Sequence, residues 1–228
     1  MPMMEQQGTV TLEQPLTLPA EGAQLHADLI VPEEVYGLVV FAADAQMCRS
    51  CSRSRRIARE FEQQGLAVLL VDLFTPEEEE EVLRSGPLQG QADLLAGRLR
   101  GVMDWVGRQA DLNEFPLGLF AQGDAAAAAL RCAAHGPSSL GAVVCRDARL
   151  DAVQSVLGEV SAPVMLLAGA SDGGSVAQSE AALLGIGSKR KEAVLVPGSS
   201  GRFEEPEELD TVADLAANWF SESLIALY

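Results

Sequence analysis

The sequence predicts an α/β fold built on one doubly wound, mostly parallel β-sheet with an antiparallel hairpin at its N-terminal edge. Short apolar runs alternate with amphipathic stretches of helical length, a pattern typical of parallel strands joined by right-handed helical crossovers. The apolar runs show little alternation, as expected of strands buried on both faces. Neither an internal repeat nor a linker interrupts this pattern. We therefore expect a single domain over residues 1–228, with 1–9 as a flexible N-terminal tail.

The first part of the chain supplies the predicted hairpin and two central strands. Val10–Leu18 and Gln24–Val31 alternate in part around a Pro-Ala-Glu-Gly turn, which predicts the hairpin. Tyr36–Ala42 and Leu66–Phe74 are almost wholly apolar and are expected as buried strands. The amphipathic stretch between them predicts a helix over Cys51–Gln64.

The rest of the chain continues the alternation of strands and helices. Glu77–Glu81 is a run of five glutamates, which we expect as a solvated loop or helix start without chemistry of its own. Gln91–Gln109 carries an apolar stripe at helical spacing and predicts a long helix. The further predicted elements are strands at Ala142–Cys145, Val164–Ala168 and Ala193–Val196 and a final helix at Pro206–Leu227.

Composition narrows the function classes. The chain has 228 residues, 48% of them hydrophobic, and a formal net charge of −17. So acidic a surface opposes binding to nucleic acid or to an anionic membrane, both of which attract basic patches. The N-terminal MPMMEQQGTV lacks the basic and apolar regions of a signal peptide, and no run reaches the roughly 18 apolar residues of a membrane span. We expect an acidic, cytoplasmic protein without a nucleic-acid or membrane partner.

The stretch Pro116–Leu130, PLGLFAQGDAAAAAL, is the most informative part of the sequence. An apolar run reaches a Gly-Asp step and continues as an alanine-rich helix, which predicts a sharp strand-to-helix turn. Small residues stand two positions either side of the bend, as Ala121 and Ala125, so that the backbone is free to turn tightly. The residue between them is Gly123, which has no side chain.

Six segments in order resemble the dienelactone-hydrolase-like branch of the α/β hydrolases. They are LVVFAADA, VDLFTPEEE, PLGLFAQGDAAAAAL, AVVCRDARLD, PVMLLAGASD and VLVPGSSGRFEEP. The resemblance extends from about Val10 to the end of the chain. It implies a single-domain α/β-hydrolase fold and an origin among hydrolases of carboxylic esters and lactones.

The resemblance also assigns functional positions, most of which are altered in this chain. Gly123 stands where the family carries its Ser or Cys nucleophile, and Gly201 stands where it carries the catalytic histidine. Asp172 occupies the position of the acid. Ala43 and Asp44 replace the His-Gly pair that helps to form the oxyanion hole. The resemblance therefore implies that no complete catalytic triad is present.

The histidines lead to the same expectation without the family. A Ser-His-Asp site needs an imidazole within hydrogen-bond reach of its nucleophile. The chain has two histidines: His26 within the hairpin and His135 one helix length beyond the turn. Ligands of open α/β sheets bind at the carboxyl ends of the strands, the opposite end from His135. We expect both histidines to be structural or exposed.

We predict a pocket beside the turn, with carboxylates among its residues. The predicted pocket residues are Asp44, Gln122, Gly123, Asp124, Cys145, Arg146, Asp172 and Arg202. Three carboxylates there would each oppose a developing oxyanion by roughly 1 to 4 kcal/mol at about 4 Å.

The carboxylates leave three alternatives open. Asp44, Asp124 and Asp172 are suited to a divalent cation or a cationic organic ligand, or are neutralised by arginine. The candidate arginines are Arg49, Arg146 and Arg202. A separate alternative is that Asp124, instead of residue 123, is the nucleophile. Gln122 and Ala126 would then stand two positions either side of it, where the tight bend needs small residues, and glutamine does not fit there. The His/Cys spacing typical of a zinc site does not occur, and we predict neither a metal nor a cofactor.

Cys48 and Cys51 form a C-x-x-C motif at the start of a predicted helix. The helix N-terminus and the nearby Arg49, Arg53 and Arg55 would lower a thiol pKa, as a redox cysteine requires. The alternative is that two small residues at a helix start happen to be cysteines. Cys145 is expected to face the pocket, and Cys132 is expected in the core.

The leading hypothesis is a catalytically degenerate α/β-hydrolase-fold protein that binds an unidentified small molecule or protein partner, with self-assembly left open. The alternative is a dienelactone-hydrolase-like enzyme with a non-standard site, either the acidic cluster or the Cys48/Cys51 pair.

Overall fold

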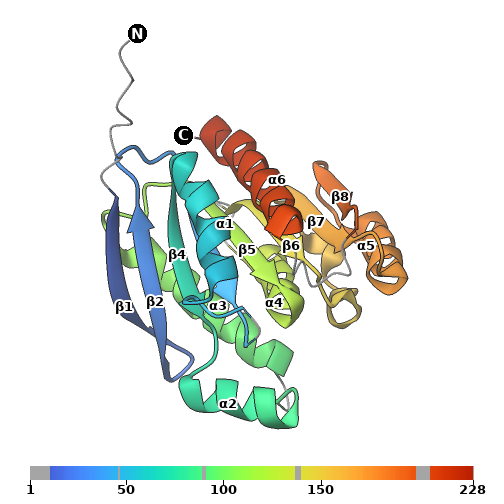
Figure 1. Cartoon of the computed structure of the whole chain (residues 1–228), viewed down its shortest axis with the longest axis horizontal. Helices are drawn as coiled ribbons and strands as arrows, with labels where there is room; N and C mark the ends of the chain where they lie inside the picture. The colour runs from blue at the N-terminus through green and yellow to red at the C-terminus, as the bar shows by residue number, and fades with distance from the viewer. Residues whose placement is uncertain (1–10, 46, 89–90, 137–139, 199–205, 228) are drawn as a thin grey trace.

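One eight-stranded sheet forms the centre of the protein (Figure 1). The computed structural model describes residues 11–45, 47–88, 91–136, 140–198 and 206–227. Its strands are β1 (Leu12–Ala20), β2 (Ala23–Val31), β3 (Gly37–Ala43), β4 (Leu66–Asp72), β5 (Leu117–Gln122), β6 (Leu140–Arg146), β7 (Val164–Gly169) and β8 (Lys191–Val196). They lie in the order β1-β2-β4-β3-β5-β6-β7-β8. β1 and β2 pair in antiparallel fashion, β2 is antiparallel to β4, and the remaining pairs are parallel.

The N-terminal hairpin confirms the predicted antiparallel edge. Glu21 and Gly22 connect β1 to β2, and both have positive φ, at 48° and 75°. Two left-handed residues in succession are typical of a type I′ turn, whose twist matches that of the flanking strands. The hairpin therefore extends the parallel sheet at one edge.

Helices cover both faces of the sheet. They are α1 (Ser52–Gln63), α2 (Pro76–Ser85), α3 (Gln91–Arg108), α4 (Gly123–His135), α5 (Gly173–Gly185) and α6 (Pro206–Leu224), with 3₁₀ turns at Leu150–Val153, Leu157–Glu159 and Ile225–Leu227. Figure 1 shows α1 and α6 on the near face, with α3 and α4 behind the sheet. Successive residues of β3 alternate between the two cores: Val40 packs on the α3/α4 side and Phe41 on the α1/α6 side. This is the doubly wound arrangement that the apolar strands predicted.

An aromatic cluster joins α1 and α6 to the sheet. The ring of Phe61 in α1 meets Phe120 of β5 and Phe220 of α6 edge-on, with both centroid distances at 5.5 Å. Such edge-to-face pairs are favourable beyond the area that they bury. The helix predicted from the amphipathic stretch after β3 is therefore confirmed, and its apolar face packs on the sheet.

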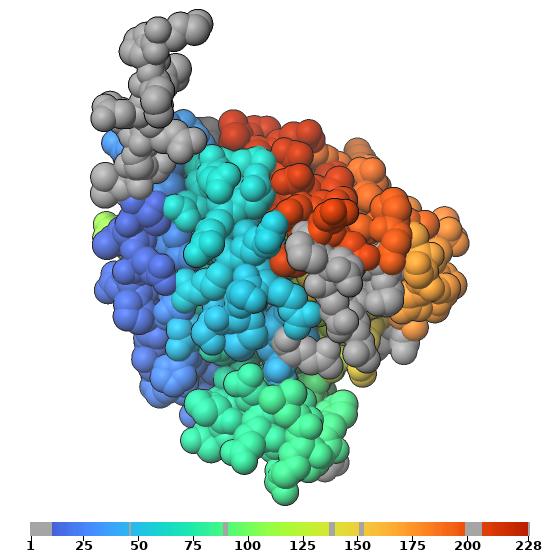
Figure 2. Space-filling model, in the orientation of Figure 1, coloured from blue at the N-terminus to red at the C-terminus, as the bar shows by residue number. Residues whose placement is uncertain are grey.

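The glutamate run forms the start of α2, which stands out at one end of the molecule (Figure 2). Thr75 caps this helix through a capping box with Glu78, and Pro76 occupies its first turn. Both carboxylate oxygens of Glu78 accept hydrogen bonds from the buried Arg98 of α3. Of the two alternatives for this segment, the helix start is the one observed.

Helix α5 was not predicted, and the last helix is shorter than expected. α5 begins with Gly173 and Gly174, two poor helix formers, and buries few residues. Asp172 starts it as the N-cap by accepting hydrogen bonds from two backbone amides. The final helix ends at Leu224 and continues as a 3₁₀ turn. Among the helices described, none is long and apolar enough to cross a membrane.

Candidate functional site

The candidate site lies at the carboxyl ends of the parallel strands, where α/β sheets bind their ligands. Asp44 follows β3, Gly123 follows β5, Asp147 follows β6 and Asp172 lies beyond β7. These residues border a pocket with a volume of about 360 Å³. Its described lining is Asp44, Gln122, Gly123, Asp124, Asp147, Ala148, Arg149, Asp172, Gly174, Ser175 and Gln178. The structure thus brings together five of the predicted pocket residues: Asp44, Gln122, Gly123, Asp124 and Asp172.

The turn after β5 is sharp. Gln122 is still extended, with φ −130° and ψ 153°, whereas Gly123 has a φ of +56° and is the first residue of α4. The left-handed region disfavours every residue with a Cβ, so glycine relieves strain at this bend. A Cβ on Gly123 would lie 2.9 Å from Asp44 Oδ2. The side-chain direction at position 123 therefore points at the carboxylate of Asp44.

Local hydrogen bonds hold several of the acidic side chains in place. The backbone N–H of Met47 donates to Asp44 Oδ1 at 3.1 Å. Asp172 Oδ1 accepts from Gly174 N at 3.0 Å and Ser175 N at 3.2 Å, which fixes it at the start of α5. Ser175 Oγ also donates to Asp147 Oδ1 at 3.0 Å. These contacts orient three carboxylates around the pocket, and the charges of two of them, Asp44 and Asp147, act on the buried Arg146.

Asp124 has different partners. Gln91 Nε2 of α3 donates to its Oδ2 at 2.5 Å, and Arg149 Nε lies 3.5 Å from its Oδ1. The side chain is thereby tied to two neighbouring segments. An aspartate nucleophile needs a base to activate the water that hydrolyses its ester intermediate, and neither Gln91 nor Arg149 is such a base. The structure therefore offers no support for Asp124 as a shifted nucleophile.

The arginines are placed differently from the prediction. Arg49 lies 2.7 Å from Asp28 and 3.1 Å from Asp72, so the expectation that it neutralises the pocket carboxylates is wrong. Among the pocket-lining residues that the structure describes, the arginine is Arg149. Arg149 was not among the pocket residues predicted from the sequence. Arg202 lies outside the described residues, as does Gly201 at the family's histidine position.

Arg146 lies beneath the pocket instead of lining it. Its side chain is fully buried, and its Nη2 donates to Gln122 Oε1 and lies 2.6 Å from Met47 Sδ. Burial, reinforced by the nearby charge of Arg53, lowers the pKa of Arg146 to about 10. The expectation that Arg146 lines the pocket is corrected: it supports Gln122 from behind.

Cys145 does not face the pocket, contrary to the prediction. It is fully buried against α4, with its Sγ 3.6 Å from the carbonyl oxygen of Ala126. Because successive residues of a strand point to opposite faces, Cys145 lies on the α3/α4 side whereas Arg146 lies on the other. Burial raises the pKa of the Cys145 thiol and removes it from site chemistry. Cys132 is buried in the same core, as predicted.

Neither histidine lines the pocket in the part of the chain that the structure describes. His26 is exposed on β2. His135 is the last residue of α4, at the opposite end of that helix from Gly123, and its Nδ1 lies 3.3 Å from Glu159 Oε2.

The acidic side chains are not arranged as metal ligands. Within the described ranges, no group of three His, Cys, Asp or Glu residues is positioned to hold a metal ion. The described residues therefore give no support to the divalent-cation alternative for Asp44, Asp124 and Asp172. Negative charge is nevertheless concentrated near Asp44: burial, with the charges of Asp72 and Asp44, raises the pKa of Glu79 in α2.

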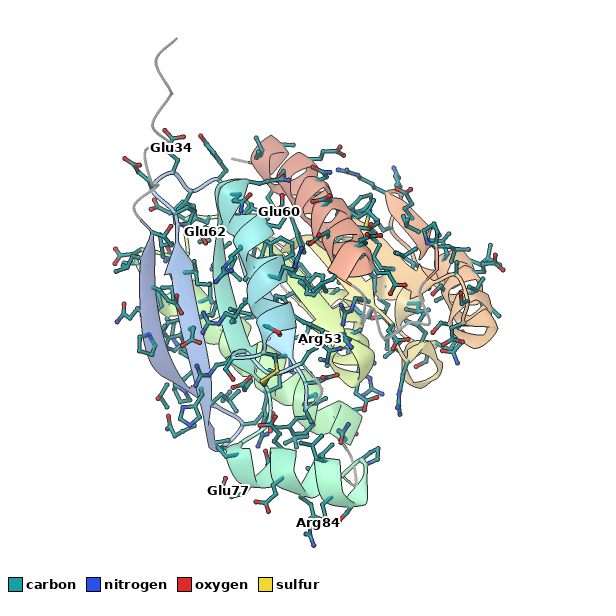
Figure 3. All side chains as sticks on the ribbon, in the orientation of Figure 1. Glu34, Arg53, Glu60, Glu62, Glu77 and Arg84 are labelled. Atoms are coloured by element: carbon teal, nitrogen blue, oxygen red, sulfur yellow. A yellow bond between two sulfur atoms is a disulfide. The ribbon has the colours of Figure 1, made fainter. Side chains whose placement is uncertain are left out.

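Cys48 and Cys51 form a disulfide at the start of α1 (Figure 3). Cys51 is the N-cap of the helix. Nearby, Arg49 is paired with Asp28 and Asp72, and Arg55 is paired with Asp28 and Glu13.

The sheet, the sharp turn at Gly123 and the pocket at the strand ends define an α/β-hydrolase-fold protein. Comparison with solved structures agrees. A dienelactone hydrolase from Anabaena variabilis is 37% identical, with a TM-score of 0.88 over 94% of this chain and 99% of that chain. Est1E from Butyrivibrio proteoclasticus has a TM-score of 0.73 at 12% identity, over 92% of this chain and 98% of its own, and shows the fold alone. The chain belongs to the dienelactone hydrolase family.

Curated relatives carry a different name. Two Mycobacterium tuberculosis proteins, from strains CDC 1551 and H37Rv, are each named "Putative phosphoribosyl transferase". They are 39% identical to this chain over 196 residues, which is 86% of this chain. The chain matches 43% of their length. No family model matches the chain.

Proposed function

We propose that this protein is a catalytically degenerate member of the dienelactone hydrolase family, a pseudo-hydrolase that binds a small molecule or a protein partner. The observation that carries the proposal is the left-handed Gly123 at the turn between β5 and α4. The family resemblance assigns the nucleophile to this position. Glycine has no side-chain oxygen or sulfur with which to attack a carbonyl carbon.

The histidines support the same proposal. An attacking hydroxyl or thiol needs an imidazole nearby to take its proton. His26 and His135 are the histidines of the chain, and both are exposed on other parts of the fold. A residue introduced at Gly123 would meet the carboxylate of Asp44, and the resemblance assigns the histidine position to Gly201.

The charge of the pocket opposes acyl transfer. Its described lining contains four aspartates, Asp44, Asp124, Asp147 and Asp172, and one arginine, Arg149. Hydrolysis of an ester needs hydrogen-bond donors where negative charge develops, and an excess of carboxylates over cations around that position raises the barrier. The same charge favours a cationic organic ligand over an anionic one.

Charge also bears on the activity named for the curated relatives. A phosphoribosyl donor carries several negative phosphate charges, which this acidic pocket would repel. We propose that the activity in their name is not performed by the pocket of this chain alone.

The test has a catalytic arm and a binding arm. Turnover of p-nitrophenyl acetate and butyrate should stay at the uncatalysed background. In thermal-shift measurements, putrescine should raise the Tm whereas succinate, a dianion of similar length, should leave it unchanged. Ester turnover abolished by Asp124→Ala or Cys48→Ser would overturn the proposal in favour of the second candidate, an enzyme with a non-standard site. The 37% identity to a dienelactone hydrolase is the observation that favours that candidate.

The partners proposed for this chain are a small molecule or a protein, including a second copy of itself, and the proposed location is the cytoplasm. The net charge of −17 supports the absence of nucleic-acid and anionic-membrane partners. Light scattering coupled to size exclusion measures self-assembly directly.

A further inference from the structure

We propose that Cys48 and Cys51 are a redox-active dithiol that exchanges with low-molecular-weight disulfides such as oxidised glutathione. The two residues are separated by three positions and joined at the N-terminus of α1, with their Cα atoms 5.3 Å apart. The pair lies outside the described lining of the pocket. The proposal is therefore independent of whether the pocket binds a ligand.

Accessibility distinguishes this pair from the other cysteines. Cys48 and Cys51 are partly exposed, and Cys48 Sγ lies 3.4 Å from the exposed Ser50 Oγ. Cys132 and Cys145 are buried, and burial raises the pKa of both of their thiols. Exchange requires a thiolate that a second disulfide is able to approach in line. Cys48 and Cys51 are accessible to such a disulfide, whereas Cys132 and Cys145 are buried away from it.

The end of α1 supplies the field that stabilises a thiolate. Cys51 is the N-cap, and the first turn of α1 contains no acidic residue. Unpaired amides at a helix N-terminus carry partial positive charge and favour a negative group beside them. The side chains of Arg49 and Arg55 are paired with carboxylates, which offset the positive charge that they add near the motif.

Contacts other than the disulfide hold the loop between the cysteines. Arg49 stands between them, and its backbone N–H donates to Asp72 Oδ1 at 2.7 Å while its Nη1 donates to Asp28 Oδ2 at 2.7 Å. The backbone N–H of Cys51 donates to the carbonyl of Cys48 at 3.0 Å. Because these bonds do not depend on the sulfur atoms, the reduced cysteines stay close enough to close the disulfide again. A dithiol that is oxidised and reduced reversibly requires its two sulfur atoms to remain close after reduction.

The proposed exchange balances with one co-reactant. A thiolate of the reduced pair attacks one sulfur of oxidised glutathione, forming a mixed disulfide and releasing one glutathione thiolate. The second cysteine, on losing its proton, attacks the protein sulfur of the mixed disulfide and releases the second glutathione. The pair is oxidised by two electrons, oxidised glutathione is reduced to two thiols, and the protons of the two cysteines pass to the two glutathione molecules.

The first measurement is a thiol count on the full chain. The reduced, desalted protein should give two thiols that react rapidly with Ellman's reagent in the native state and four after unfolding, because the chain has four cysteines and two are buried. Equilibration with oxidised glutathione should remove the two rapid thiols. The matched control is the Cys48→Ser/Cys51→Ser double variant. It should give none in the native state and two after unfolding, with an unchanged circular dichroism spectrum.

The second measurement separates a redox couple from a structural disulfide. Native protein equilibrated over a series of reduced-to-oxidised glutathione ratios should pass from fully oxidised to fully reduced within the series. Cys48→Ser and Cys51→Ser should each leave one thiol in the motif, and at least one of these variants should trap a mixed disulfide visible by mass spectrometry. A pair that stays oxidised at every ratio, or stays reduced with excess oxidised glutathione, would overturn the proposal.

Discussion

The carboxylate of Asp44 faces the backbone of Gly123: a Cβ built on the glycine would lie 2.9 Å from Asp44 Oδ2. Asp44 comes from the loop after β3, and Gly123 from the turn after β5, the strand that pairs with β3 in parallel. Parallel pairing brings the two strand ends together. The side chain of a nucleophile at position 123 would therefore be directed towards a negative charge instead of an imidazole.

Replacing Gly123 by serine should not create an esterase. Its φ of +56° costs an L-residue about 1–2 kcal/mol, and the new hydroxyl would meet Asp44. The expected result is a loss of stability of that size in urea unfolding, with p-nitrophenyl acetate turnover at background. Gly22→Ala is the matched control, since Gly22 also has a positive φ but has no atom within 4 Å of a built Cβ. A burst of p-nitrophenol from Gly123→Ser would contradict the pseudo-hydrolase proposal.

Removing one pocket charge should weaken the binding of a cation while preserving the fold. Asp172→Asn keeps the side-chain oxygen that caps α5, since asparagine is an equally good N-cap, and removes the negative charge. The thermal shift produced by putrescine should decrease, with the Tm of the unliganded protein changed little. The control is Asp93→Asn, a change at an exposed residue of α3 that pairs with Arg131. Equal shifts in both variants would show that putrescine binds elsewhere.

The ion pair between Glu78 and Arg98 should make α2 sensitive to acid. The hydrogen bonds from Arg98 hold the pKa of Glu78 below its ordinary value of 4.5. Because the folded-state pKa is depressed, the contribution of this carboxylate to stability is complete above that ordinary value. It is lost as the pH falls through the lower, folded-state pKa.

Glu78→Gln tests this dependence. The variant should lose about 2 kcal/mol of stability at pH 7, where the charged hydrogen bonds are intact, and progressively less as the pH falls below 4.5. Glu81→Gln is the control, since Glu81 pairs with Arg84 on the exposed side of the same helix. Urea unfolding at a series of pH values measures both. A deficit for Glu78→Gln that stays constant with pH would contradict the assignment.

Asp28 should be the most sensitive residue of the network that holds the motif loop. Its side chain is 5% exposed and accepts hydrogen bonds from both Arg49 and Arg55. Asp28→Asn leaves two guanidinium groups without their shared counter-charge and should cost about 3 kcal/mol. Glu13→Gln removes an exposed partner of Arg55 and should change stability little. Chemical unfolding of the two variants measures the difference, and equal losses would contradict a central role for Asp28.

The order of strands and helices was determined by the sequence, because burial on both faces of a parallel sheet requires continuous apolar runs such as those of β3 and β4. The same reasoning found part of the candidate site. Residues that follow parallel strands meet at one edge of the sheet, so Asp44, Gly123 and Asp172 were expected together. α5 escaped prediction because its two initial glycines and its small buried face give no helical signal.

Tertiary structure alone decided which side chains meet. Arg49 pairs with Asp28 and Asp72, which lie 21 and 23 positions away, because β2 and β4 are neighbours in the sheet. Because side chains alternate between the two faces along β6, Cys145 packs against α4 instead of facing the pocket. Arg149, in the loop after β6, forms an ion pair with Asp124 at the start of α4. Periodic burial is a local property that a sequence displays, whereas the partner of a charge depends on which distant segments the fold brings within reach.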